Sequence, residues 1–301
     1  MELRRAKLSM CEKYLNELKI KLKQFTTLVE IPPIPWDYSY IVALTHDVDV
    51  TSVRERSWLS VGYAIYNCFL DRDFVDGAKI FLAKFGLCKD PWNKFEEWIK
   101  IESELGVRST FYFIPFKDVP GMDSPKIIAG KYELDKDLIN RLIKDGFEVG
   151  VHGIDNWRDQ KRAKEEFKKL SELTNLNVGN RTHFLLRNED TWKILDACGY
   201  MYDSTFGYND DVGFRAGTLQ VYKPKEVENL LELPLHIQDG ALFMRSCLKL
   251  TEDEAKGRCD KIFDFANEFG GVITLLWHQM SLAVPHDWGN FYRYLVIKAS
   301  K

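Results

Sequence analysis

Residues 40–49 read YIVALTHDVD, and this stretch decides how the rest of the chain is interpreted. Its β-branched and aliphatic start is typical of a buried strand in a parallel sheet. Alternate side chains of a strand share a face, so Asp47 and Asp49 lie together and His46 points the other way, where we expect it to pack. Two adjacent carboxylates repel each other unless a cation or a shared proton lies between them. A turn carboxylate pair is the simpler alternative.

Short apolar runs of the same kind recur along the chain and alternate with helical patterns, which predicts an α/β fold with a parallel sheet. The seven expected strands cover 40–45, 109–114, 148–151, 182–186, 200–204, 230–237 and 272–276. The expected helices cover 92–105, 135–145, 158–174, 189–198 and 251–269, several of them closed by glycine. Seven such strands favour a closed or nearly closed barrel.

The connection after the first strand is too long for one helix, and its aromatic-rich residues 53–86 predict two extra helices. We interpret about 53–90 as a helical insert. Because it leaves the carboxyl end of the first strand, it should border any site built there. Tyr63, Tyr66 and Phe69 could then contact a substrate, or they could only pack the extra helices onto the barrel.

Residues 1–37 are expected to form a helical arm, because a charged amphipathic pattern over 1–30 is stopped by IPPIP at 31–35. The arm could dock on the barrel domain, 38–301, or it could pair two chains as a homodimer.

Composition excludes several classes of protein. The 301 residues carry 42 basic and 45 acidic side chains, a net charge of −3, which argues against a globally basic nucleic-acid binder. No apolar run approaches the roughly 18 residues of a membrane helix, and no secretory signal is visible. Six scattered cysteines suggest reduced thiols. We expect a cytoplasmic protein, with a peripheral position at the inner membrane face as the alternative.

Polar residues also mark the ends of later strands. His152 follows the third strand, Arg181 and His183 begin the fourth, Asp239 follows the sixth, and His278 ends the seventh. Parallel strands bring their carboxyl ends to one rim of a barrel, where active sites are built. Together with the two aspartates, this set is typical of a metal-dependent hydrolase.

At this point the sequence resembles the polysaccharide deacetylases, the NodB-homology family or carbohydrate esterase family 4, over roughly 38–299. The motifs that carry the resemblance are LTHDVD (44–49), EVGVHGIDNW (148–157), the Arg181 segment, GYMYDST (199–205) and LLWH (275–278). The resemblance implies a distorted (β/α)7 barrel. It also implies a divalent metal, usually Zn²⁺, and removal of N- or O-acetyl groups, mostly from N-acetylglucosamine polymers.

The resemblance also assigns roles to single residues. Asp47 matches the catalytic base, Arg181 the arginine that holds it, and His278 the general acid, with Asp239 as its tuning aspartate. Asp49 and His152 match metal ligands.

The chain departs from the family at the second metal histidine, where Asn156 stands with Asp155 before it. Asp155, or else Asn156, could supply the third ligand, or the metal could be weak or absent. His183 or His286 could substitute, although nothing in the sequence directs them inward. A carboxylate-rich site would shift the preference toward Mn²⁺.

The leading hypothesis is a metal-dependent hydrolase of C–N bonds that deacetylates an amino sugar or glycan. The aromatic residues expected to bind sugar are Trp157, Phe206, Tyr208 and Trp277. The alternatives are a catalytically inert carbohydrate-binding barrel and a hydrolase of a non-sugar amide.

Overall fold

The computed structural model describes residues 38–70, 72–117, 119–121, 124–129, 132–283 and 288–300, with a few positions between 13 and 24. The predicted arm over 1–37 lies almost entirely outside the described residues, and so does His286. The arm and the homodimer therefore remain predictions.

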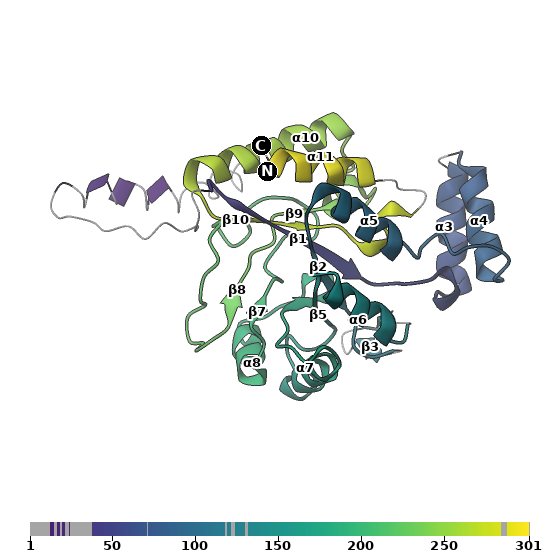
Figure 1. The fold of residues 1–301 in the computed structure, drawn as a ribbon, viewed down its shortest axis with the longest axis horizontal. Helices are drawn as coiled ribbons and strands as arrows, with labels where there is room; N and C mark the ends of the chain where they lie inside the picture. Colours follow the sequence, from purple (N-terminus) through teal and green to yellow (C-terminus); the bar gives the residue numbers. More distant parts are fainter. Residues whose placement is uncertain are drawn as a thin grey trace.

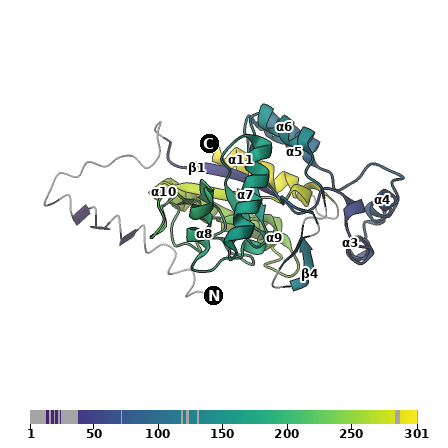
Figure 2. The ribbon, with the colours of Figure 1, turned by 90° about the horizontal axis from the view of Figure 1, so that it is seen from below.

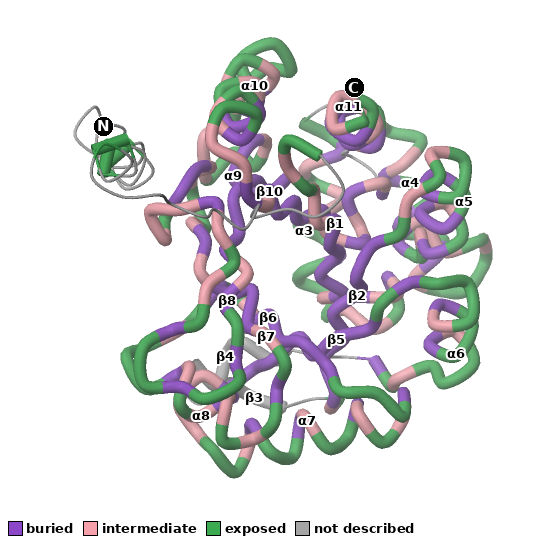
Figure 3. The backbone as a smooth tube through the Cα atoms, turned by 60° about the vertical axis from the view of Figure 1, so that its left-hand side comes forward, coloured by how far each residue is buried: buried purple, intermediate pink, exposed green. Residues whose placement is uncertain are grey.

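Eight strands form one sheet, in the order β8-β7-β6-β5-β2-β1-β10-β9, and every neighbouring pair is parallel. The sheet curls around a buried interior as an incomplete barrel (Figure 3). This confirms the predicted α/β fold, a distorted barrel of the (β/α)7 type. The strands are β1 (Ile41–Val48), β2 (Thr110–Phe113), β5 (Glu148–Gly153), β6 (Asn180–Thr182), β7 (Tyr202–Asp203), β8 (Leu231–Glu232), β9 (Ile237–Gln238) and β10 (Val272–Leu276).

Helices cover the outside of this sheet (Figures 1 and 2). Most follow the predicted patterns, and α5 (Phe95–Leu105) ends where Gly106 adopts the left-handed conformation with φ 70°. A short antiparallel pair, β3 (Val119–Gly121) and β4 (Ser124–Ala129), lies outside the main sheet. The barrel helices are α5 (Phe95–Leu105), α6 (Lys136–Lys144), α7 (Gln160–Thr174), α8 (Thr191–Cys198), α9 (Asp239–Phe243), α10 (Glu252–Phe269) and α11 (Gly289–Ala299).

Between β1 and β2 the chain forms the two expected extra helices, α3 (Trp58–Leu70) and α4 (Phe74–Lys84). They pack on each other through a small apolar core that includes Val61, Cys68 and Ile80. In Figures 1 and 2 this α3–α4 hairpin stands out from the barrel beside the end of β1.

Two strand predictions were wrong in their boundaries. The strand expected over 230–237 is two strands, β8 and β9, at opposite ends of the sheet. The strand expected over 182–186 is β6, which ends at Thr182 and is followed by a 3-10 turn, His183–Leu185. Phe184 and Leu185 have φ of 56° and 52°, a left-handed backbone that cannot continue a strand. His183 therefore follows a strand end instead of beginning a strand.

His46 has the packing role that alternation predicted. Its ring lies 4.3 Å from that of Trp98 and 4.6 Å from that of Phe111, on the side of β1 away from the two aspartates. Its Nε2 lies 2.8 Å from a carboxylate oxygen of the buried Glu102.

Candidate active site

The carboxyl ends of the parallel strands form one rim, which we call the carboxyl rim. Asp47 near the end of β1, Asp49 just beyond it and His152 on β5 lie side by side there, because β1, β2 and β5 are neighbours in the sheet. The close approach of both carboxylates to one histidine agrees with the predicted shared face.

Three potential ligands converge at this rim. His152 Nε2 lies 3.1 Å from Asp49 Oδ1, and His183 Nδ1 lies 3.2 Å from the same oxygen. The two ring nitrogens are 3.1 Å apart. Among the described residues, Asp49, His152 and His183 form the only group of three or more such side chains with the spacing of a metal site. We call them the candidate metal centre.

The chemistry of these donors fits a cation. His152 Nδ1 donates to the main-chain oxygen of Arg181 at 2.7 Å, so Nε2 of the neutral ring carries a lone pair. That lone pair faces His183 Nδ1 and Asp49 Oδ1. Because lone pairs on neighbouring atoms repel each other, a proton or a metal ion must lie between these three atoms. Burial disfavours the charged ring, but Asp47 and Asp49 outweigh it and raise the pKa of His152. Burial also opposes the ionised form of Asp49, yet the nearby histidines hold its pKa well below the ordinary value.

The third ligand predicted at Asp155 or Asn156 is not at this centre. Asp155 is buried and accepts from Arg158 at 3.1 Å. Asn156 Nδ2 donates to Asn180 Oδ1 at 2.7 Å, and its oxygen accepts from Thr182. The loop after β5 thus turns both side chains into the fold, and the turn after β6 supplies His183 in their place.

Asp47 lies beside the candidate metal centre, with Oδ2 3.9 Å from His152 Nε2. The guanidinium of the fully buried Arg181 donates to Asp47 Oδ1 at 3.4 Å and to Ser204 Oγ at 2.8 Å. Arg181 also lies 5.0 Å over the ring of Tyr112, so its position is fixed from several sides. The Asp47–Arg181 pairing that the resemblance implied is present.

Asp239 and His278 form the second predicted pair. Asp239 Oδ1 lies 2.8 Å from His278 Nδ1, and Oδ2 accepts the main-chain N–H of His278 and the hydroxyl of Ser281. His278 Nε2 faces the centre, 3.7 Å from Asp49 Oδ2. Burial opposes the imidazolium, but Asp239 and the two rim aspartates raise the pKa of His278 to about 10. Asp239 thus favours the protonated ring.

Two adjoining pockets open at the rim. The reaction pocket, about 260 Å³, is lined by Asp47, the candidate metal centre and His278. The hairpin pocket, about 710 Å³, shares Asp49 and His278 with it and extends to Leu59 and Tyr63 of α3. The insert therefore borders the site, as its position in the sequence predicted.

The predicted sugar-binding aromatics lie elsewhere. Trp277 is fully buried, stacks on Phe291 and donates to the main-chain oxygen of Trp288, so it belongs to the core. Alternation explains this, since its neighbour His278 points into the pocket. Trp157, Phe206 and Tyr208 are half-buried, and none of them lines either pocket. The guanidinium of Arg187 lies 4.0 Å over the ring of Phe206.

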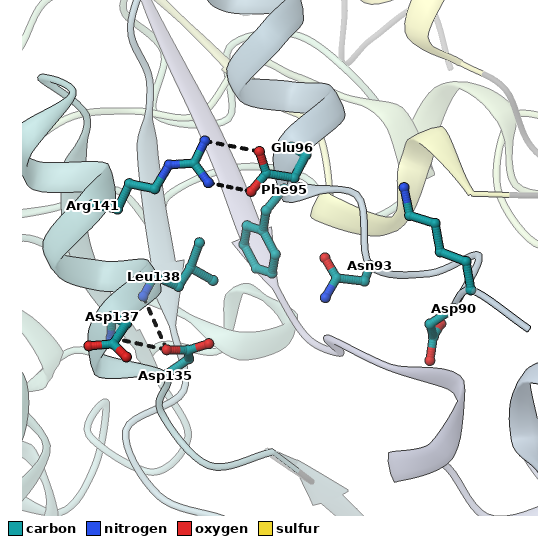
Figure 4. A pocket seen from close by; sticks show the side chains of 9 residues that line it. Asp90, Asn93, Phe95, Glu96, Asp135, Asp137, Leu138 and Arg141 are labelled. Atoms are coloured by element: carbon teal, nitrogen blue, oxygen red, sulfur yellow. Dashed lines mark hydrogen bonds and ion pairs between the residues drawn. The ribbon is translucent and has the colours of Figure 1, made fainter. Parts of the chain in front are cut away.

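A third cavity, about 470 Å³, lies outside the barrel between α5 and α6 (Figure 4). Arg141 binds both carboxylate oxygens of Glu96 there, and Asp135 caps the start of α6.

Comparisons with known proteins support the fold. No family model and no curated protein matches the chain. A solved structure assigned to the polysaccharide deacetylases, from Mycobacterium smegmatis, has a TM-score of 0.53 at 19% identity, covering 90% of this chain and 88% of the other. A Puue allantoinase gives 0.58 at 13% identity, covering 91% and 89%. A Pseudomonas aeruginosa structure, also assigned to the deacetylases, gives 0.55 at 12% identity with the same coverage.

These likenesses span nearly the whole of each chain, but the sequence identities are low. They therefore establish the architecture, and the reaction has to be inferred from the residues of the site. The chain has the fold that polysaccharide deacetylases share, as the resemblance in its sequence predicted.

Proposed function

We propose that this protein is a metal-dependent hydrolase that removes an acetyl group from an N-acetylated, or O-acetylated, sugar or glycan. One observation carries the proposal. A candidate metal centre, a carboxylate held by arginine and a histidine paired with aspartate all line one pocket of about 260 Å³.

Asp49, His152 and His183 would hold the metal. Two imidazoles and one carboxylate are a ligand set found in catalytic zinc sites, which supports Zn²⁺ over the Mn²⁺ favoured by a carboxylate-rich set. When bound, such an ion polarises a carbonyl and lowers the pKa of a water.

Asp47 is suited to the role of general base. Its partner Arg181 keeps one carboxylate oxygen engaged, and its other oxygen lies on the side of the candidate metal centre. In the proposed reaction Asp47 accepts a proton from the water whose oxygen attacks the acetyl carbon.

His278 is suited to the role of general acid. Asp239 fixes Nδ1, so the protonated Nε2 faces the pocket. As the C–N bond breaks, this proton passes to the leaving nitrogen, and the products are acetate and an amine. On an O-acetylated substrate the same proton would pass to the leaving oxygen.

Two alternative functions are distinguished by the experiment that tests the proposal. The first alternative is a carbohydrate-binding barrel without activity, which the absence of the family's second metal histidine suggests. His183 offers a substitute for that histidine. A non-sugar amide remains a candidate substrate because the fold is shared with an allantoinase.

The test is acetate release from N-acetylglucosamine and its oligomers, by protein stripped with a chelator and reloaded with Zn²⁺ or Mn²⁺. We expect release only after reloading. Binding of the sugar without release by any metal form would contradict the proposal and favour the inert barrel. Hydrolysis of non-sugar amides alone would favour the second alternative.

A further inference from the structure

The α3–α4 hairpin exposes an unusual amount of apolar surface. Of the twenty-five large hydrophobic side chains that are exposed among the described residues, twelve lie within residues 58–87. Helix α3 carries no charged residue at all. Exposed patches of this kind mark surfaces that bind a partner.

This apolar surface covers two outward sides of the hairpin. On α3, Leu59, Tyr63, Tyr66 and Leu70 recur at helical spacing, opposite the face that packs on α4. On α4, the exposed residues include Phe74, Val75, Phe81 and Leu82. A second protein copy meeting one flat side would leave the other side exposed, whereas a lipid interface can surround both.

The charges near the hairpin fit an anionic surface. The insert, residues 53–90, carries six basic and five acidic side chains, a net charge of +1 in a chain whose total is −3. Lys84 bonds the main-chain oxygens of Arg54 and Arg56 and lies 5.4 Å over Trp58, which gathers three cations at the base of the hairpin. Asp76 is engaged by Lys79 at 2.6 Å.

The hairpin is too short to span a bilayer. The 13 residues of α3 extend about 20 Å, against a hydrocarbon core of about 30 Å. Among the described residues, no helix has the length and apolar character to cross a membrane. Apolar and aromatic faces bordered by Lys and Arg are typical of segments that lie within the membrane interface.

We propose that the α3–α4 hairpin binds the surface of an anionic lipid bilayer. Leu59 and Tyr63 belong both to its exposed face and to the hairpin pocket, which reaches His278. Binding there would place the opening of the site at the lipid surface. The exposure and charge of the hairpin do not depend on the proposed reaction.

The test is flotation of the full chain with vesicles of phosphatidylcholine, with and without phosphatidylglycerol. The wild type should float with the anionic vesicles and more weakly with the neutral ones. A Tyr66→Asp, Val75→Asp double variant changes one exposed residue on each side of the hairpin and should lower the bound fraction by about tenfold or more. The matched control is Leu176→Asp, Met201→Asp, because these barrel residues are similarly exposed.

Circular dichroism of both double variants establishes that they fold. Loss of flotation in the hairpin variant alone supports the proposal. No flotation of the wild type, or equal flotation of both variants, would overturn it. A dimer in gel filtration that the hairpin variant abolishes, without vesicle binding by the wild type, would assign the surface to a second copy. Only lipid is used as ligand, so failure of the proposed deacetylation would not affect the result.

Discussion

The carboxyl rim and the α3–α4 hairpin adjoin each other but are built in opposite ways. At the rim, Asp47 and Asp239 are buried, and each is matched by a cationic partner. On the hairpin, apolar side chains face outward, and Leu59 is 86% exposed. The difference indicates that the rim is organised around a reaction and the hairpin around contact with something outside the protein. Changes in the two regions should therefore affect different measurements.

The largest effect should come from Asp47→Asn at the rim. The amide keeps the shape of the side chain but cannot act as the base, so kcat should fall by about 10²–10⁴. Metal content, measured by elemental analysis, should not change because Asp47 is outside the candidate metal centre. Turnover close to the wild-type rate would show that another group is the base.

Glu166 on α7 gives a contrast with the rim carboxylates, because it is buried, accepts the main-chain N–H of Ile154 at 3.4 Å, and has burial as the largest influence on its ionisation. Burial raises its pKa to about 8. The unfolded chain ionises Glu166 near pH 4.5, whereas the folded chain keeps the proton until about pH 8, so stability should fall as pH rises between these values.

Glu166→Gln removes this dependence. Relative to the wild type, its free energy of unfolding should rise by roughly 3 kcal/mol between pH 5 and pH 8, measured by denaturant titration at both values. A difference between the two proteins that does not vary with pH would contradict the buried neutral carboxyl.

The smallest effect should come from the hairpin. Tyr63 lines the hairpin pocket, whereas Tyr66, 55% exposed, does not. Tyr63→Ala should raise KM for a long glycan roughly fivefold, because an aromatic contact contributes on the order of 1 kcal/mol. It should leave kcat on a small acetylated substrate unchanged.

Tyr66→Ala is the matched control and should leave both constants as they are. If Tyr63→Ala instead loses stability and both activities in parallel, the hairpin is only structural at that position.

The positions of most rim residues could be predicted from the sequence because each stands at a strand end, and strand ends meet. His183 was harder to assign, since the apolar run FLL after it suggested a strand where the chain makes a left-handed turn. Strand alternation from Arg181 does not extend to His183, because β6 ends at Thr182. Asp155 was expected at the centre from motif spacing alone, whereas its side chain accepts from Arg158. The exposure of the hairpin could not be predicted, because composition does not reveal which aromatic side chains are covered.

If His183 completes the candidate metal centre, its removal must lower metal binding. Wild type, His183→Ala and the control Asp155→Asn would be stripped, reloaded with Zn²⁺ and analysed for bound metal after dialysis. We predict stoichiometric zinc in the wild type and in Asp155→Asn, and loss of zinc in His183→Ala, since one of three ligands is gone. Full zinc in His183→Ala together with loss in Asp155→Asn would contradict the account.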